Sequence, residues 1–233
     1  MSTLVVAIDG PSGSGKSSVS REVARRLGLA YLDTGAMYRA ATWWCVHEGV
    51  PLADQATVAR AVRDLPLDQG VDPDAPHVVV GGTDVGDAIR ETAISAAVSA
   101  VATNLEVRDE LRRLQRAAIA AQRAGSSFSQ GRGIVAEGRD ITTVVAPDAD
   151  VRILLTASQE ARLARRARDV HGSDDAAAVA ATHDQVVRRD ADDSTVAAFQ
   201  VAADGVVTVD SSDLDFEQTV QAVLAVVAQA GRA

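Results

Sequence analysis

The sequence predicts an α/β fold built on a doubly wound, mostly parallel sheet. Short apolar runs rich in β-branched residues, typical of strands buried on both faces, alternate with stretches whose apolar residues recur at helical spacing. A glycine-rich loop joins the first of these runs to the first helical stretch. With 233 residues, the chain is long enough for one large domain and a buried core.

The first four elements alternate strand and helix. Residues 3–8 form a nearly continuous apolar run and predict a buried strand. Residues 17–27 carry apolar side chains at helical spacing, and Gly28 is a typical helix stop. Residues 29–33 then predict a second short strand, and residues 35–48 a second helix.

The stretch that follows has a different character. Residues 50–86 are richer in Pro, Gly and Asp, with one strand signal at 77–80 and a turn signal at Gly81-Gly82, so we expect an inserted subdomain here. A long helical pattern then covers residues 104–123. Its expected buried stripe is Leu105, Leu111, Leu114 and Ile119.

The α/β alternation then resumes. Strands separated by helical crossovers imply parallel pairing in one sheet, since a parallel pair needs a long connection. A turn is expected at residues 138–140. The remaining strands are predicted at 133–136, 151–155 and 206–209, and the helices at 158–170, 173–190 and 214–230.

The composition narrows the class of protein. Hydrophobic content of 47% and charged content of 24% are typical of an ordinary globular chain. A net charge of −9 supplies no global basic field for nucleic acid or an anionic membrane, so we expect neither as a partner. The single cysteine, Cys45, excludes an internal disulfide and is expected in the core. No apolar segment is long enough to span a bilayer and no signal peptide is evident, so the chain is expected to be cytoplasmic.

The glycine-rich loop is a phosphate-binding loop. Gly10-Pro11-Ser12-Gly13-Ser14-Gly15-Lys16-Ser17 fits G-x-x-x-x-G-K-[ST] between a strand and a helix, which is the context that supports the motif. The expected ATP-binding residues are these eight and the following Ser18. Its backbone N–H groups and the helix N-terminus can bind the phosphates of ATP, and the Ser17 hydroxyl suits Mg²⁺. Lys16 is the only lysine in a chain whose other basic residues are arginines. A compact ammonium fits inside a ring of amides where a planar guanidinium does not.

The loop alone leaves kinases, GTPases and mechanical ATPases open. A second motif, Asp33-Thr34-Gly35-Ala36-Met37-Tyr38-Arg39, ends one strand and opens a helix. Thr34 and Arg39 can therefore face the crevice at the carboxyl ends of the strands, where ligands bind. Asp33 also lies near the loop and is a candidate carboxylate beside Mg²⁺.

Taken together, the motifs make the chain resemble the bacterial cytidylate kinases. DGPSGSGKSS, LDTGAMYR, IRETAISAAVSAVA, VRDELRRLQR, EGRD and RRDADDS occur in that family's order and spacing over roughly residues 3–230. The resemblance implies a P-loop nucleoside monophosphate kinase fold and transfer of a phosphoryl group from ATP to CMP or dCMP. We expect one domain over 1–233 and a monomer. Its parts would be a core of about 1–49, 104–156 and 191–233, a monophosphate-binding insert of about 50–103 and a lid of about 157–190.

The resemblance also implies residue roles. Ser99, Arg108 and Asp140 would contact cytosine: the carboxylate can accept from the exocyclic amine, while the other two donate to the O2/N3 edge. Uracil would present a carbonyl to that carboxylate, a mismatch that discriminates strongly. The acceptor-phosphate ligands would be Thr34, Arg39, Arg139 and Arg189, and the sugar contact Asp193. An arginine guanidinium can donate two parallel N–H bonds to two oxygens of one phosphate, so arginines suit this role.

The expected chemistry needs no general base, because the attacking phosphate oxygen is already ionised and positioning with charge neutralisation can carry the catalysis. Three arginines, Arg162, Arg165 and Arg166, lie at i, i+3 and i+4 on one predicted helix, which the resemblance makes a mobile lid over ATP. None of the four histidines fits as a base. The expected catalytic set is Lys16, Arg39, Arg139, Arg162, Arg165 and Arg189.

One position departs from the family pattern R-D-x-x-D-S-x-R. Here valine, Val196, stands where a second arginine belongs. We expect Arg188 or a lid arginine to compensate, with the cost falling on monophosphate affinity. Two alternatives stay open: another small P-loop kinase with a different acceptor, or a catalytically weak nucleotide-binding regulator. A GTPase is disfavoured because no N-K-x-D segment occurs.

Overall fold

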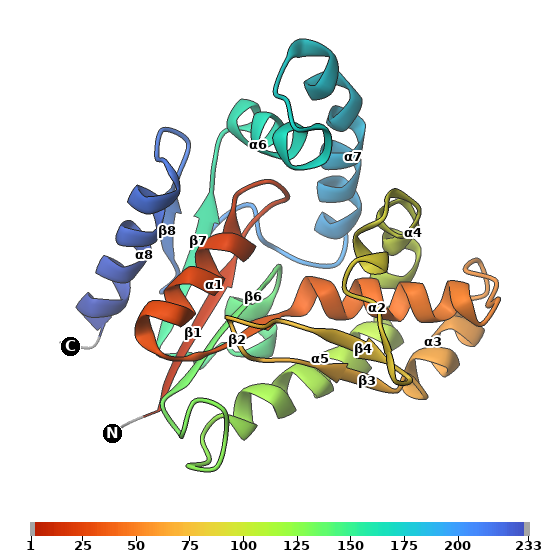
Figure 1. Ribbon diagram of the computed structural model, residues 1–233, viewed down its shortest axis with the longest axis horizontal. Coiled ribbons are helices and arrows are strands. Elements are labelled where there is room, and N and C mark those ends of the chain that lie inside the picture. Colours follow the sequence, from red (N-terminus) through yellow and green to blue (C-terminus); the bar gives the residue numbers. More distant parts are fainter. Residues whose placement is uncertain (1–2, 231–233) are drawn as a thin grey trace.

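A five-stranded parallel sheet forms the centre of the computed structural model, which describes residues 3–230 except the side chains of 184 and 185. The strand order is β2-β6-β1-β7-β8, so the strand that precedes the phosphate-binding loop is the central one. Figure 1 shows the sheet with helices on both sides. The strands are β1 (Leu4–Asp9), β2 (Ala30–Asp33), β6 (Gly133–Gly138), β7 (Val151–Thr156) and β8 (Val207–Asp210).

Each face of the sheet has its own apolar core. Along β1, Val6 and Ile8 pack in the cluster that includes α1 (Lys16–Leu27) and α8 (Phe216–Ala230). Val5 and Ala7 point to the opposite face, in the cluster shared with α2 (Thr34–His47) and α5 (Leu105–Ala121). Successive side chains of a strand alternate between faces, so a strand covered on both sides is apolar throughout. The predicted doubly wound sheet is confirmed.

The insert has its own antiparallel sheet, of three strands. Gly81 and Gly82 adopt φ of 57° and 83° and form the tight turn of its hairpin, as the glycine pair predicts. Its apolar residues join one cluster with α2 and α5, which fastens the insert to the core. Its elements are α3 (Gln55–Arg63), β3 (Leu67–Gln69), β4 (Val78–Val80), β5 (Thr83–Asp84), the 3₁₀ turn η1 (Ala88–Arg90) and α4 (Thr92–Ala102).

Two helices, α6 (Gln159–His171) and α7 (Ala176–Ser194), pack against each other. In Figure 1 they stand beyond the carboxyl ends of β1 and β7, and α7 also touches α4 of the insert. A π-helical turn, η2 (Ile141–Val145), follows β6 at the same edge of the sheet. This edge therefore carries the phosphate-binding loop, η2 and the two helices together.

Some sequence expectations are corrected. Leu105 is 66% exposed, and Val107 is fully buried in its place. The Asn104 side chain accepts hydrogen bonds from the N–H groups of Glu106 and Val107, so the helix begins at Leu105 with its first turn towards solvent. Helix α3 and strands β3 and β5 were not expected, and α7 extends beyond 190 to Ser194. Cys45 is fully buried, as predicted. Within residues 3–230, no helix is long and apolar enough to cross a membrane.

Candidate active site

The phosphate-binding loop has the backbone that its glycines suggest. Gly13 and Gly15 adopt φ of 76° and 83°, in the left-handed region that side chains disfavour. A Cβ at Gly13 would also lie 2.6 Å from the carbonyl oxygen of Arg162 on α6. Helix α1 begins at Lys16 directly after the loop, so its free N–H groups face the same space. The loop can therefore surround a phosphate.

Lys16 is half-buried among charges. Its Nζ lies 3.4 Å from the carbonyl oxygen of Pro11, so the side chain folds back over its own loop. Burial, followed by the charge of Arg139, lowers the pKa of Lys16 to about 8, against the opposing effect of Glu137. An anion placed here would raise the pKa of Lys16 again by stabilising its ammonium form, so this charge arrangement favours phosphate binding.

Glu137 is the carboxylate that lies beside Ser17. The Ser17 hydroxyl donates to Glu137 Oε1 at 2.6 Å, whereas Oε2 is buried with no hydrogen-bond partner. Glu137 on β6 lies opposite Asp33 on β2 in the register of these two parallel strands. Burial, then the charge of Asp33, raises the pKa of Glu137 to about 7. Asp33 was the sequence candidate for this position, but its Oδ1 accepts from the N–H of Ala36 at 2.9 Å and caps α2.

Arg139 is held from several sides. Its guanidinium lies 4.4 Å from the ring centre of Phe199 and donates to the carbonyl oxygen of Gly10 at 3.1 Å. It is also paired with Asp193 and, at 3.2 Å, with Asp190. These contacts hold the guanidinium beside the phosphate-binding loop.

Two further arginines crowd the same region. The Arg189 Nε lies 3.7 Å from Asp193, and burial, then the charges of Arg39 and Arg139, lowers its pKa. Burial also lowers the pKa of Arg39, with repulsion from Arg90 and Arg166, and the Nε of Arg39 is buried without a partner. Cations from α2, the turn after β6 and α7 thus meet near Lys16. Such a cluster is electrostatically favourable only with anions between its members.

Thr34 opens α2 in this crevice, as the sequence predicts. Its hydroxyl donates to the carbonyl oxygen of Glu137 at 2.7 Å. Gly138 leaves room for it, because a Cβ there would lie 2.4 Å from Thr34 Oγ1. The structure therefore brings Thr34, Arg39, Arg139, Arg189 and Asp193 into one region, as expected from the motifs.

The residues expected around the base form a second group. Arg108 and Asp140 are almost fully buried and make a 2.6 Å ion pair. The Arg108 guanidinium also donates to the carbonyl oxygen of Ala102 at 3.1 Å and lies 5.5 Å from the ring centre of Tyr38. Arg112, which sequence reasoning missed, donates to the same oxygen of Asp140.

The third expected base contact, Ser99, lies on α4. It lines a cavity of about 50 Å³ together with Ser12, Arg166, Arg188 and Arg189. A cavity of this size holds a water molecule or two but not a nucleotide. The structure therefore places Ser99 beside this small cavity, between α4 and the helices α6 and α7.

The arginines of α6 meet different partners. Arg162 donates to the carbonyl oxygen of Ser12 at 2.9 Å and pairs with Asp190. Arg165 donates to the carbonyl oxygen of Ser14 in the phosphate-binding loop at 3.4 Å, and also binds the loop after β8, with bonds to the Ser211 hydroxyl at 3.0 Å and the Leu214 carbonyl at 3.2 Å. All three arginines thus reach the region of the phosphate-binding loop, and Arg165 in addition fastens α6 to the core.

Asp190 and Asp9 are further residues that the sequence did not single out. Asp190 accepts from the backbone N–H of Ser12 at 3.0 Å as well as from Arg139 and Arg162, and so links α7 to the loop. Asp9, which is 1% exposed, accepts from the N–H groups of Ile141 and Thr142 at 2.9 and 2.8 Å. Asp9 therefore holds η2, and with it the turn that carries Arg139 and Asp140.

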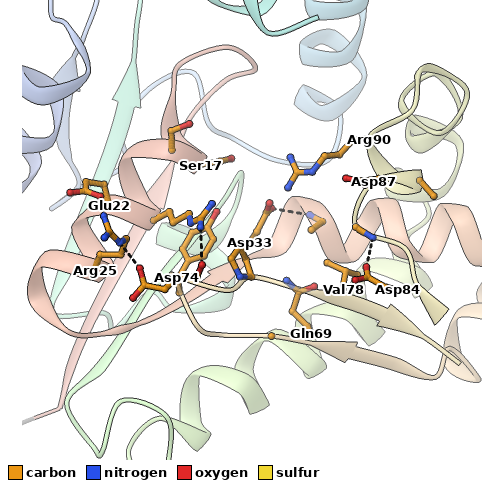
Figure 2. Close-up of a pocket in the computed structure, with 18 of the residues that line it drawn as sticks. Ser17, Glu22, Arg25, Asp33, Gln69, Asp74, Val78, Asp84, Asp87 and Arg90 are labelled. Atoms are coloured by element: carbon orange, nitrogen blue, oxygen red, sulfur yellow. Dashed lines mark hydrogen bonds and ion pairs between the residues drawn. The ribbon is translucent and has the colours of Figure 1, made fainter. Parts of the chain in front are cut away.

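A cleft of about 1120 Å³ separates α1 from the insert. Figure 2 shows Ser17 and Asp33 on one side and Arg90 reaching towards them from the insert. Arg25 and Asp74 bridge the outer end of the cleft at 2.6 Å. Within the described residues, no group of three or more His, Cys, Asp or Glu side chains is placed to hold a metal by itself.

These features together define a P-loop nucleoside monophosphate kinase fold: a phosphate-binding loop after the central strand, an arginine-rich crevice beside it, an insert and two covering helices. A family model described as cytidylate kinase matches residues 6–229. The chain belongs to the cytidylate kinase family.

Curated relatives support this assignment over almost the whole chain. A cytidylate kinase of Nocardia farcinica is 50% identical over 232 residues, 97% of this chain and 94% of that protein. One of Rhodococcus opacus is 50% identical over 233 residues, 98% and 96% respectively. One of Streptomyces avermitilis is 46% identical over 225 residues, 96% and 92% respectively.

Proposed function

We propose that this chain transfers the γ-phosphoryl group of ATP to CMP or dCMP, giving ADP and CDP or dCDP. The observation that carries the proposal is the meeting of Lys16 with Arg39, Arg139 and Arg189, at a phosphate-binding loop in a member of the cytidylate kinase family. A donor loop alone would need no such group of arginines. A second phosphate beside the first explains them.

The donor half of the site is the loop at residues 10–18. Its backbone N–H groups and the N-terminus of α1 would bind the phosphates of ATP, and Lys16 would neutralise their charge. Arg162 lies against Ser12 of this loop, close enough to reach a transferring phosphoryl group after a small movement of α6. Arg165 would also lie beside the donor phosphates, since it donates to the Ser14 carbonyl oxygen of the loop at 3.4 Å, and its bonds to Ser211 would hold α6 in place.

The acceptor half lies on the other side of Lys16. Thr34, Arg39, Arg139 and Arg189 would bind the phosphate of CMP, and Asp193 its sugar. Asp190 and Asp193 pair with two of these residues, Arg139 and Arg189, and so place negative charge within the cluster. Binding of phosphate would release those ion pairs and reposition α7, which couples substrate binding to movement of the lid, residues 157–190.

The residues around Ser17 suit Mg²⁺. A serine hydroxyl, a neighbouring Glu137 carboxylate with one unpartnered buried oxygen, and incoming phosphate oxygens form the all-oxygen environment that Mg²⁺ prefers. Ser17 would be the protein ligand, and Glu137 would orient it. Bound Mg²⁺ would neutralise charge on the β- and γ-phosphates.

The attacking group is a phosphate oxygen, which is already ionised at neutral pH. The protein therefore has only to hold the two phosphates in line and neutralise their charge. Lys16 and the arginines do this, while closure of α6 and α7 excludes water that would otherwise accept the phosphoryl group.

Arg188 and Arg166 would replace the arginine missing at Val196. Both line the small cavity beside Arg189 and Ser99, whereas Val196 follows the end of α7 at Ser194. The side chains of Arg166 and Arg188 thus lie next to two residues of the proposed acceptor site, Arg189 and Ser99. We expect the chain to work as a monomer in the cytoplasm, where its nucleotides occur, with no nucleic acid or membrane partner.

The test is a coupled assay of ADP release from ATP and Mg²⁺ with CMP, dCMP, UMP and AMP as acceptors. The proposal predicts turnover with CMP and dCMP, and much weaker turnover with UMP and AMP. Efficient turnover with AMP alone would indicate a different P-loop kinase. ATP binding with no turnover of any monophosphate would favour a regulatory protein.

A further inference from the structure

Asp140 is held by two guanidinium groups rather than one. Arg108 donates to its Oδ2 at 2.6 Å, and Arg112 donates to the same oxygen through Nη2 at 2.8 Å and Nε at 3.1 Å. Both arginines lie on α5, one helical turn apart, so they approach the carboxylate from neighbouring positions. Asp140 and Arg108 each keep 5% of their side-chain area exposed, and Arg112 keeps 16%.

The two arginines are fixed differently. Arg108 has a second anchor at the carbonyl oxygen of Ala102 and lies over the Tyr38 ring. Arg112 is directed mainly at Asp140; among the residues that the structure describes, its other ion pair is a 3.6 Å contact to the exposed Asp109. The main contact of the Arg112 guanidinium is therefore the Asp140 carboxylate, whose orientation it fixes.

This arrangement leaves one carboxylate oxygen for a ligand. In the part of the chain that the structure describes, every side-chain hydrogen bond to Asp140 ends on Oδ2. Three N–H donors on one oxygen fix the plane of the carboxylate, since turning it would break all three bonds. Because the plane of the carboxylate is fixed, the position of the Asp140 Oδ1 atom is fixed as well.

We propose that Arg112 is a positioning residue for base discrimination: it locks Asp140 so that Oδ1 accepts from the exocyclic amine of cytosine and cannot turn away from the carbonyl of uracil. The inference rests on the proposed function, in which Asp140 contacts the base. A carboxylate that could rotate would expose Arg108 to the uracil carbonyl, which accepts hydrogen bonds, and UMP would bind more readily. A locked carboxylate instead leaves uracil facing an unpaired acceptor.

The experiment compares kcat/KM for CMP, dCMP and UMP in the wild-type protein, Arg112→Met and Arg112→Lys. In Arg112→Met, we expect the CMP/UMP ratio to fall about tenfold, the order expected for losing hydrogen bonds to a charged group. The CMP/dCMP ratio should not change, because both substrates carry cytosine. Lysine keeps the charge and one donor, so Arg112→Lys should recover part of the CMP/UMP ratio.

The matched control is Arg113→Met. Arg113 is the next residue on α5, but it is exposed and pairs with Glu110 at 2.6 Å, so its loss should leave both ratios unchanged. A ratio of kcat/KM values does not depend on the amount of folded enzyme, so partial unfolding of a variant does not mimic the effect.

Two results would overturn the inference. If the wild-type protein uses CMP and Arg112→Met keeps the full CMP/UMP ratio, Arg112 has only a structural role. If the CMP/UMP and CMP/dCMP ratios fall together, Arg112 acts on the nucleotide as a whole and not on the base. Failure of the proposed function would look different, because the wild-type protein itself would then show no turnover of CMP.

Discussion

Replacing Glu137 by glutamine should make the protein more stable and less active. Glu137 is 1% exposed and accepts a hydrogen bond from the Ser17 hydroxyl. It lies opposite Asp33 in the register of the parallel strands β6 and β2. Glutamine has the same shape and keeps an oxygen to accept from Ser17. The substitution therefore removes the buried charge while preserving the packing.

The magnitude follows from the pKa of Glu137, which burial and Asp33 raise from 4.5 to about 7. A rise of this size corresponds to about 3 kcal/mol of free energy that opposes folding with an ionised carboxylate. Because the folded pKa is the higher one, the contribution of Glu137 to the free energy of unfolding falls as the pH rises from 4.5 to 7 and is constant above. Glu137→Gln should thus match the wild type near pH 4 and exceed it by up to about 3 kcal/mol at pH 8.

Denaturant unfolding at pH 4, 6 and 8 measures this difference, with the exposed Glu48→Gln as the matched control. Turnover should fall about 10- to 100-fold in Glu137→Gln, as for other residues that support a metal ligand. Equal stability of wild type and variant at pH 8 would refute the reasoning about the buried charge. Unchanged turnover would show that Glu137 does not support Ser17.

Three further predictions concern the acceptor and donor halves. Val196→Arg should lower the KM for CMP severalfold, and an unchanged KM would mean that this position does not touch substrate. Gly138→Ala should destabilise the protein by about 1–3 kcal/mol in denaturant unfolding and raise the KM for CMP, because the new methyl group would displace Thr34; a normal KM would exclude Thr34 from phosphate binding. Because phosphates should raise the pKa of Lys16 from about 8, ATP binding at pH 8.5 should take up protons and weaken as the pH rises further. Calorimetry in two buffers of different ionisation enthalpy detects the uptake, and its absence would contradict the charge assignment.

Most of the fold could be predicted from the sequence because its signals are local. The strands before and after the phosphate-binding loop are continuous apolar runs, and the helices between them start or stop at recognisable residues such as Gly28. The helix at Leu105–Ala121 was found for the same reason. Its buried face was assigned wrongly at Leu105, because two of the residues that really point inward, Arg108 and Gln115, are polar and weaken the apolar pattern.

The site could be predicted only as far as its motifs reach. Residues such as Arg39, Arg139 and Arg189 are marked by motifs, and the structure brings them together as expected. Glu137 and Arg112 lie within the motifs EGRD and VRDELRRLQR, but the motifs do not show what these two side chains do, because their partners are 120 and 28 positions away in the chain. The π-helical turn after Asp140 has the same origin, since the distant Asp9 holds it. Long-range pairing of this kind appears only in the folded chain.

The central claim is that one site has two halves, with Lys16 serving the donor and the arginines the acceptor phosphate. The most direct test measures the dissociation constant of CMP and the turnover in Lys16→Arg, with Arg39→Met as the converse variant. We predict that Lys16→Arg keeps CMP affinity within about threefold while turnover falls at least about 100-fold, and that Arg39→Met weakens CMP at least about tenfold. Near-normal turnover in Lys16→Arg, or unchanged CMP affinity in Arg39→Met, would contradict the account.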